Sequence, residues 1–453
     1  MNMKLSTIAL LILSLNSTLV MAKVTEQQAA QLGQSLTPLG AEKAANADGS
    51  IPEWKGGLTT STVKASPDSG RPVDPFATDK PIFVITNSNL EQYKARLSAG
   101  QLAMFKKYAD YQMPVYQTQR TAAYPENLYP VIRNNAVNAE LVAGGNGLSN
   151  FSTTIPFPIP QSALEVVWNH ITRYRGGSAQ RSLTTIPVQA DGSHTVVKMA
   201  DQLAWPEFLA EGRDAKADDN VLFYYMQQIT APARLTGTAL LVHETIDQIK
   251  EARRAWVYNT GQRRVRRAPN VAYDGPAAGA DGLRTADNFD MYNGAPDRYE
   301  WKLIGKKELY IPYNNYKLLN TQLKYADLVK AGHLNSAYLR YELHRVWVVE
   351  ASLKEGERHI YAKRTMYIDE DSWGASVIDH YDGRGELWKM AEAHNVMFYD
   401  VATPWMVAET LHDLNSGRYL VTGLSNEEPK FMVWGNKAQR GDFSSGALRR
   451  IGH

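Results

Sequence analysis

Three segments rich in aromatic and β-branched residues follow one another within residues 220–267, with only turn-like connections between them. They are a strand-like run at 221–226, a second at 235–245, and a basic hairpin at 255–267. Consecutive short strands of this kind are typical of antiparallel sheets. Because the pattern of short strands and turns continues to the end of the chain, the sequence predicts one large antiparallel sheet over its second half, with function on its apolar face.

Further strands are predicted where apolar and polar residues alternate or where β-branched residues cluster. Turns at 369–372 and 382–385 connect some of them, since Asp, Gly and Ser tolerate turn geometry. The predicted strands are 195–199, 298–304, 308–313, 341–353, 358–368, 375–381, 386–392, 396–401, 418–424 and 431–434.

Helices are predicted before and within the sheet. Capping boxes beginning at Ser88, Ser98 and Ser162 start three amphipathic helices, the last of which ends at 176–177. They are expected to pack on the sheet, and a helix laid across an open barrel mouth would also serve as a lid. A late helix is predicted over 403–417, because Thr403 and the proline after it carry an N-terminal helix signal.

The first 22 residues have the pattern of a secretory signal peptide. Lys4 precedes an apolar run at 8–15, and small residues lead to a cleavage site after Ala22. The run is too short to span a bilayer. We therefore predict three regions: a signal peptide at 1–22, an N-terminal extended segment at 23–80, and a single domain at 81–453 with a helical N-terminal elaboration.

Net charge and cysteine content argue against some classes of partner and of covalent modification. The formal net charge is +2, which becomes about +1 without the signal peptide, so no broad electrostatic footprint for nucleic acid is present. The chain has no cysteine. An exported chain of this length buries enough apolar surface to need no disulfide, and without cysteine it is not a lipoprotein.

Templates for catalysis do not match. The chain lacks a Gly-x-Ser-x-Gly elbow, a His-Glu-x-x-His motif, a phosphate loop and a cysteine nucleophile, so no catalytic residue, cofactor or metal site is predicted. His243, His344, His359 and His380 fall in predicted strands, where hydrogen-bonded histidines are commoner than metal ligands. A glycosidase with two separate carboxylates needs no local motif and stays open as the enzyme alternative.

Several motifs resemble one family. They are the run 36–57, RAWVYN at 254–259 with QRRVRRAP at 262–269, DNFDMYNG at 287–294 with YEWK at 299–302, and HIYAKR at 359–364 with YIDEDSW at 367–373. The chain resembles an uncharacterised, domain-of-unknown-function family of exported Gram-negative proteins related to the outer-membrane lipoprotein-sorting proteins LolA and LolB. The resemblance covers essentially the whole mature chain.

The resemblance implies a fold, a location and a function. It implies an incomplete antiparallel β-barrel with helices over its mouth, in the periplasm, that binds acyl chains in an apolar cavity. Members are often encoded beside RND-type exporters and outer-membrane partners, which implies a role in moving lipids or other hydrophobic compounds. The family has no assigned catalytic residues.

Candidate site residues come from the apolar face of the predicted sheet. The expected ligand-binding residues are Tyr225, Trp256, Tyr258, Trp301, Leu303, Trp347 and Val349. The basic hairpin supplies Arg264 and Arg266, which alternation places on one face, for contact with a partner or with the anionic headgroups of a membrane surface. As a solvated strand pair, this hairpin needs no function.

Two classes of function remain. Burying an acyl chain of roughly 15 methylenes offers on the order of 10 kcal/mol, enough for a carrier without a charged anchor. The alternative is an envelope sensor or assembly protein that uses its sheet edge to contact a partner and takes no small ligand. An open apolar cavity favours the carrier, and a filled barrel with a long exposed edge favours the interaction protein.

Overall fold

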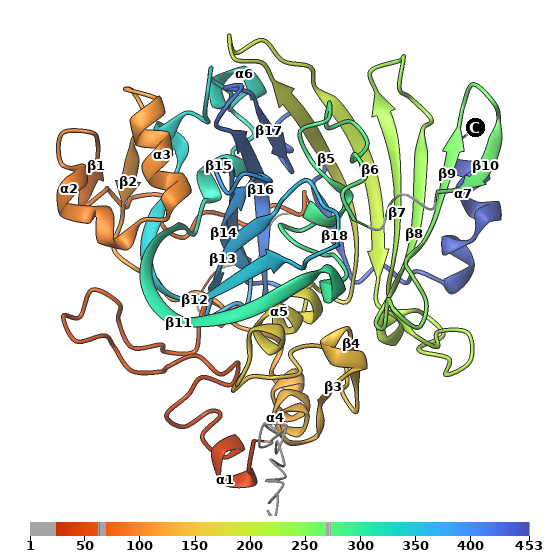
Figure 1. The fold of residues 1–453 in the computed structure, drawn as a ribbon, viewed down its shortest axis with the longest axis horizontal. Coiled ribbons are helices and arrows are strands. Elements are labelled where there is room, and N and C mark those ends of the chain that lie inside the picture. The colour runs from red at the N-terminus through yellow and green to blue at the C-terminus, as the bar shows by residue number, and fades with distance from the viewer. Residues whose placement is uncertain (1–23, 62, 64–68, 269–270, 272, 453) are drawn as a thin grey trace, which may run out of the picture.

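The computed structural model describes residues 24–61, 63, 69–268, 271 and 273–452. The predicted signal peptide and its cleavage site after Ala22 lie outside these residues. Most of the described chain is organised around one 16-stranded sheet, whose strands cross the molecule side by side in Figure 1.

The sheet has two halves, which meet where β17 pairs with β5. In spatial order, the first half is β1 (Phe83–Ile85), β2 (Met113–Val115), β12 (Tyr341–Leu353), β13 (Lys363–Asp369), β14 (Ala375–Tyr381), β15 (Leu387–Phe398), β16 (Thr403–Asp413) and β17 (Tyr419–Thr422). The second half is β5 (Ser178–Val188), β6 (Val197–Ala204), β7 (Val221–Ala231), β8 (Ala239–Thr245), β9 (Arg254–Asn259) and β10 (Arg264–Arg267). Two further strands branch off this order: β11 (Tyr299–Pro312) pairs with β12, and β18 (Met432–Trp434) pairs with β5.

The strand pairs are antiparallel, except that β2 meets β12 in parallel at Val115 and Tyr341. In the described part of the chain, β1 and β10 stand at opposite ends of the strand order and do not pair with each other, so the sheet is open. The predicted fold class, a mainly β protein built on a large incomplete antiparallel barrel with helices, is therefore confirmed.

The helices are short and pack at several places around the sheet. They are α1 (Glu26–Ala29), α2 (Leu90–Tyr93), α3 (Ala99–Lys107), α4 (Tyr129–Asn138), α5 (Ala163–Thr172), α6 (Tyr325–Leu328) and α7 (Ser445–Gly452). Helix α3 packs on β14 and β15, α5 on β11 and β12, and α7 on β8, β9 and β10. Figure 1 shows α4, α5 and the small hairpin of β3 (Glu140–Val142) and β4 (Gly147–Ser149) beyond the lower ends of the strands. Among the described residues, no helix combines the length and the apolar character that crossing a membrane requires.

Strong alternation and turn chemistry located several strands correctly. The predicted ranges 341–353 and 375–381 coincide with β12 and β14. The pair 298–304 and 308–313 is one strand, β11, with a register shift between Leu303 and Gly305, and the pair 386–392 and 396–401 is likewise one strand, β15. In both strands, an irregularity that resembles a strand end in the sequence is a β-bulge, and the strand continues beyond it.

The predicted helix at 403–417 is wrong, because these residues form β16. Thr403 and Pro404 imitate a helix start, but Pro404 is the second residue of a strand that pairs with β15 opposite Met397. A proline is tolerated near a strand end, where its missing N–H breaks no central ladder. The following residues to 412 are mostly buried on both faces, so they lack the alternation that marks a half-exposed strand.

Several other elements also differ from prediction. Strand β5 was not predicted, although it joins the two halves of the sheet. Helix α2 begins after Asn89, whose side chain caps no helix N–H, so the capping box at Ser88 is absent. Helix α5 does begin after Ser162, but it ends at Thr172, before the glycine pair at 176–177.

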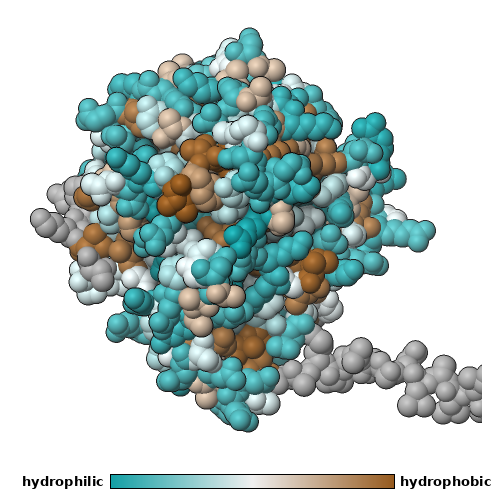
Figure 2. Space-filling view, turned by 90° about the vertical axis from the view of Figure 1, so that its left-hand side faces the viewer, coloured by the Kyte–Doolittle hydropathy of each residue, from teal (hydrophilic) through white to brown (hydrophobic). Residues whose placement is uncertain are grey.

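Large exposed apolar side chains are few in the part of the chain that the structure describes. Figure 2 shows a mostly hydrophilic face broken by small hydrophobic spots. The large apolar side chains that are exposed come from separate parts of the chain: Val73, Ile82, Ile249, Ile304, Ile360 and Val433. A site for a hydrophobic compound is therefore to be sought inside the fold.

Candidate functional site

Strands β7, β8 and β9 present two different faces. Tyr224, Leu241 and Tyr258 lie on one face and pack in the cluster that α7 covers. Leu240 and Val257 lie on the opposite face, as the pleat of a strand dictates, and line a cavity of about 190 Å³. Because a water molecule needs on the order of 15 Å³ of free volume, this cavity has room for a small ligand or for part of a longer chain.

The cavity walls are mainly apolar. They come from β5 to β9, from β16, and from the irregular segment 273–293, which we call the roof segment. The apolar side chains of the walls are Leu183, Met199, Phe223, Ile229, Leu240, Val242, Val257, Phe289, Trp405 and Met406. The Phe289 ring of the roof segment lies 5.1 Å from the Tyr225 ring and 6.3 Å from the Phe223 ring, measured between centroids.

Polar contacts hold the roof segment on the sheet. The Asn293 amide donates to Glu244 Oε2 at 2.8 Å, and the Met291 backbone N–H donates to Glu409 Oε2 at 3.3 Å. Asp290 and Met291 have φ values of 54° and 67°, in the left-handed region that costs a non-glycine residue on the order of 1 kcal/mol or more. Such strain persists where the surroundings impose it, and Asp290 itself lines the cavity.

One part of the cavity wall is charged. Arg173 and Arg175 both pair with Asp290, at 2.5 and 2.6 Å, and Arg181 binds Asp201 through two hydrogen bonds of 2.9 and 2.5 Å. Burial alone would raise the pKa of Asp290, but the two guanidinium groups more than offset this effect and hold it well below its usual range. Burial lowers the pKa of Arg175 to about 10, which leaves it charged at neutral pH.

Two more ion pairs complete this charged part. Arg253 Nε lies 2.8 Å from Glu244 Oε2. Arg284, from the roof segment, is held more loosely, with its Nη1 atom 3.8 Å from Glu409 Oε1. Burial raises the pKa of Glu409, so its negative charge is less secure than that of an exposed glutamate.

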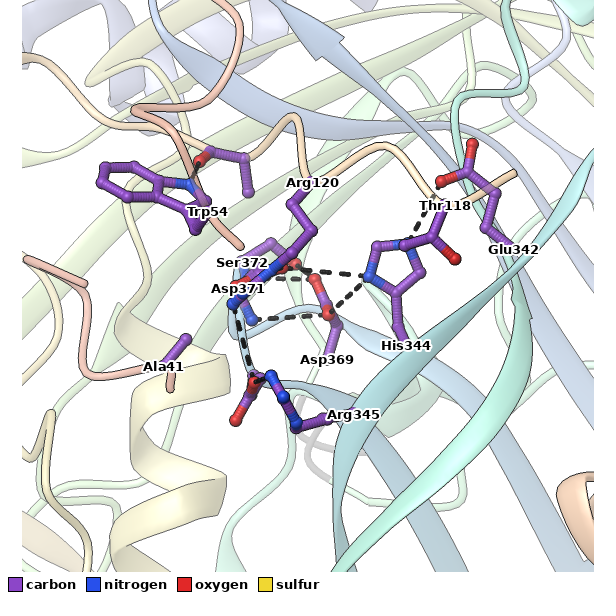
Figure 3. A network of polar contacts seen from close by, with 12 residues as sticks. Ala41, Trp54, Thr118, Arg120, Glu342, His344, Arg345, Asp369, Asp371 and Ser372 are labelled. Carbon is purple, nitrogen blue, oxygen red and sulfur yellow. Dashed lines mark hydrogen bonds and ion pairs between the residues drawn. The ribbon is translucent and has the colours of Figure 1, made fainter. Parts of the chain in front are cut away.

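A second buried polar cluster lies away from the cavity, at the turn between β13 and β14 (Figure 3). Arg120 donates to both carboxylate oxygens of Asp371, at 2.9 and 2.6 Å, and also to the backbone carbonyls of Glu42, Lys43 and Pro52. Arg345 donates to the Ala44 carbonyl at 3.0 Å. The cluster therefore fastens the N-terminal segment to the sheet.

Three groups of this cluster have metal-binding chemistry, but one of them is already paired with an arginine. One ligand atom each from His344, Asp369 and Asp371 lies within 4.8 Å of the others. Burial would lower the pKa of His344, but the carboxylates of Asp371 and Glu342, the second of which is hydrogen-bonded to the ring at 3.2 Å, more than offset burial and raise it to about 9. Arg120 already binds both carboxylate oxygens of Asp371. The cluster is a salt-bridge network.

This network predicts a pH-dependent stability. Since the folded pKa of His344 is about 9 against 6.5 in the unfolded chain, its contribution is complete below pH 6.5 and lost as pH rises to 9. We expect wild type to exceed a His344→Gln variant in unfolding free energy by a few kcal/mol at pH 6.5, and by much less at pH 9. Urea unfolding of both proteins across this range measures the difference. A difference that is constant with pH would contradict a charged His344.

The structure separates the predicted ligand-binding residues. Tyr225 lines the cavity. Trp256 and Tyr258 instead lie on the other face of β9, in the cluster under α7, where the Trp256 ring packs edge-on against His243.

The four remaining residues belong to β11 and β12 and pack in the main core. Trp301 donates its ring N–H to the Pro296 carbonyl, and Leu303 packs against the same core. Trp347 stacks with Trp373 at 6.3 Å, and Val349 is fully buried. The structure thus brings Tyr225 alone of the seven to the cavity, and ligand binding by the other six stays a prediction.

Arg264 and Arg266 lie on β10, the last strand of the sheet, and both are exposed. Val265 pairs with Tyr258, on the face under α7, whereas Arg266 pairs with Val257, which lines the cavity. Directly paired residues share a face of an antiparallel sheet. The two arginines therefore extend the cavity-lining face to the edge of the sheet.

Sequence reasoning missed most of the residues around the cavity. Arg175 follows α5, Arg284 and Phe289 belong to the roof segment, and Glu409 lies in the strand that was predicted as a helix. Residues 287–294 stood out only as a family motif. The buried Arg-x-Arg pattern at 173–175 is the one local signal that pointed to a carboxylate partner.

Comparison with known proteins gives a family and distant structural relatives. The model of the family described as "Protein of unknown function (DUF1329)" matches residues 84–449. The uncharacterized protein PA3922 of Pseudomonas aeruginosa is 58% identical over 444 residues, which cover 98% of this chain and 97% of that protein.

Two solved structures are distant structural neighbours. A putative outer membrane lipoprotein-sorting protein domain from Vibrio parahaemolyticus is 16% identical, with a TM-score of 0.45, and covers 64% of this chain and 98% of that one. The LolA superfamily protein NE2245 from Nitrosomonas europaea is 13% identical, with a TM-score of 0.38, and covers 63% and 98%.

Proposed function

This chain belongs to the DUF1329 family, and we propose that it is a carrier that binds a lipid or other hydrophobic compound in the cavity beneath the roof segment. The observation that carries the proposal is the mainly apolar cavity of about 190 Å³ on the inner face of an open sheet. Ligand sites are typically concave, mostly apolar and furnished with a few polar groups. A filled sheet interior would instead have favoured a pure interaction protein.

The proposal extends to location and partners. An apolar segment at 8–15 followed by small residues supports export to the periplasm with cleavage after Ala22. There the protein would pass its ligand to or from an export system, of which an RND-type exporter or an outer-membrane protein would be the partner. Binding and transfer, rather than catalysis, account for the cavity.

Uptake of a fluorescent fatty acid tests the proposal. We expect saturable binding of one probe per chain, with the blue-shifted, enhanced emission of a dye moved from water into an apolar site. Folded protein that leaves the probe emission unchanged would contradict the carrier and favour the envelope interaction protein.

The edge strand β10 offers a contact for the membrane from which a ligand is taken. Each basic residue near an anionic surface adds about 1 kcal/mol to association. Reversing both charges, Arg264→Glu with Arg266→Glu, should therefore weaken binding to vesicles containing anionic lipid by roughly tenfold or more, as measured by cosedimentation. Arg384→Glu, a reversal of an exposed arginine in the turn between β14 and β15, is the matched control. Equal vesicle binding by all three proteins would remove β10 from the function.

A further inference from the structure

We infer that the compound bound in this cavity is an anionic amphiphile, whose acid group is held by Arg284 while its hydrocarbon part lies along the apolar wall. The inference rests on the proposed carrier function and names its ligand class. A carboxylate and a phosphate share the required chemistry, because both present charged oxygens to a guanidinium group.

The charged side chains around the cavity do not balance. The arginines at the cavity, or paired with its lining, outnumber the carboxylates by one. They are Arg173, Arg175, Arg181, Arg253 and Arg284, set against Asp201, Glu244, Asp290 and Glu409. His170, which neighbours this group, is held neutral because burial lowers its pKa to about 3. An unbalanced positive charge is costly in a water-poor cavity unless an anion joins it.

Arg284 is paired less closely than the other four arginines. The other four arginines each have a carboxylate oxygen within 3.0 Å, as in a charge-assisted hydrogen bond. Arg284 lies 3.8 Å from Glu409, beyond hydrogen-bonding distance. Among the described residues its guanidinium donates no hydrogen bond, and its Nε atom is buried without a partner. Arg284 is therefore a charged group on this wall with unused donors.

A second unused donor lies on the same cavity. Arg175 is 2% exposed, and its Nε atom is also buried without a partner, although its other two nitrogens are bonded to Asp290 and the Ile171 carbonyl. Leaving a buried charged donor unsatisfied costs on the order of 1–3 kcal/mol or more. Two such donors around one cavity indicate that an oxygen-rich group is received there.

Part of the remaining wall suits a hydrocarbon. Leu183, Ile229, Leu240 and Val257 supply a wall without hydrogen-bonding side chains. A neutral hydrophobic compound would contact this wall but leave Arg284 unpaired. A small anion would pair with Arg284 but leave the apolar wall without a contact. A molecule with an acid head and an apolar tail matches both parts.

The test compares acids with their neutral analogue. Palmitate, a monoacyl glycerol phosphate and methyl palmitate each displace the uncharged fluorescent probe N-phenyl-1-naphthylamine from the full mature chain. We expect at least one acid to bind roughly 10- to 100-fold more tightly than the ester, the ratio that charge-assisted hydrogen bonds provide. A preference confined to palmitate identifies a free fatty acid, and one confined to the phosphate identifies a phospholipid head.

Variants locate the effect. Arg284→Gln should remove the preference for the acid and leave ester binding unchanged, whereas Arg384→Gln, which removes an exposed arginine in the turn between β14 and β15, should keep the preference. The wild-type comparison needs no variant, so the test survives a folding defect in Arg284→Gln. Equal affinity of wild type for acids and ester would overturn the anionic ligand and leave the carrier function standing. Failure of folded wild type to bind any of these compounds would overturn the carrier function itself.

Discussion

Replacing Arg120 by alanine should lower the free energy of unfolding by about 3–5 kcal/mol, the range found when one partner of a buried ion pair is removed. Asp371 and Glu370, its carboxylate partners, have side chains that are each 2% exposed. Without the guanidinium group, these two buried carboxylates lose a positively charged partner. The backbone carbonyls of Glu42, Lys43 and Pro52 also lose their donor, so the N-terminal segment should loosen first.

Urea unfolding followed by tryptophan fluorescence measures this loss. The matched control is Arg96→Ala, since Arg96 links the same N-terminal segment to β11 through Asp48 and Glu308, at 3.3 and 3.1 Å, but lies at the surface. Exposed ion pairs contribute about 1 kcal/mol or less. If the two variants lost equal stability, the cluster in Figure 3 would not be the clamp described here.

Filling the cavity should abolish high-affinity binding. Leu240 lines the cavity from β8, opposite Val257 on β9, and an indole in its place would occupy the space of several methylene groups. Each methylene excluded from an apolar site costs about 0.8 kcal/mol. Exclusion of three to four methylenes therefore predicts a loss of roughly 100-fold in affinity for a fatty acid in Leu240→Trp.

The control for this variant adds the same bulk outside the cavity. Ile249 is 55% exposed, so Ile249→Trp should bind as wild type does. Fluorescent fatty-acid titration gives the affinities, and thermal unfolding checks that both variants are folded. A folded Leu240→Trp protein with wild-type affinity would place the ligand elsewhere.

The fold was largely predictable because its strands carry local signals. Strand β11 has clean alternation at 299–303, and β14 is bounded by turn residues on both sides. Strand β5 was missed, since its polar residues and Pro187 are characteristic of loops. In the folded chain, pairing with β6, β17 and β18 holds these residues in a strand. Tertiary context also overrode the helix signal at Thr403 and Pro404.

The cavity was much less predictable, because no single stretch of sequence contains it. Leu183, Leu240, Arg284 and Glu409 come from three strands and an irregular segment that meet only in the folded chain. Tyr225 was found because its strand was recognised. Trp256 and Tyr258 were assigned to the ligand from their aromatic character, although the side-chain alternation of β9 directs them under α7. Recognising which face lines the cavity needed the position of α7, which the sequence did not reveal.

Native mass spectrometry of protein purified from the periplasm, combined with lipid extraction, tests the carrier function most directly. We expect one amphiphile for each chain, recovered in the extract and absent from the Leu240→Trp variant. Ligand-free protein that also fails to take up a fluorescent fatty acid would contradict the carrier function and leave the envelope interaction protein as the better description.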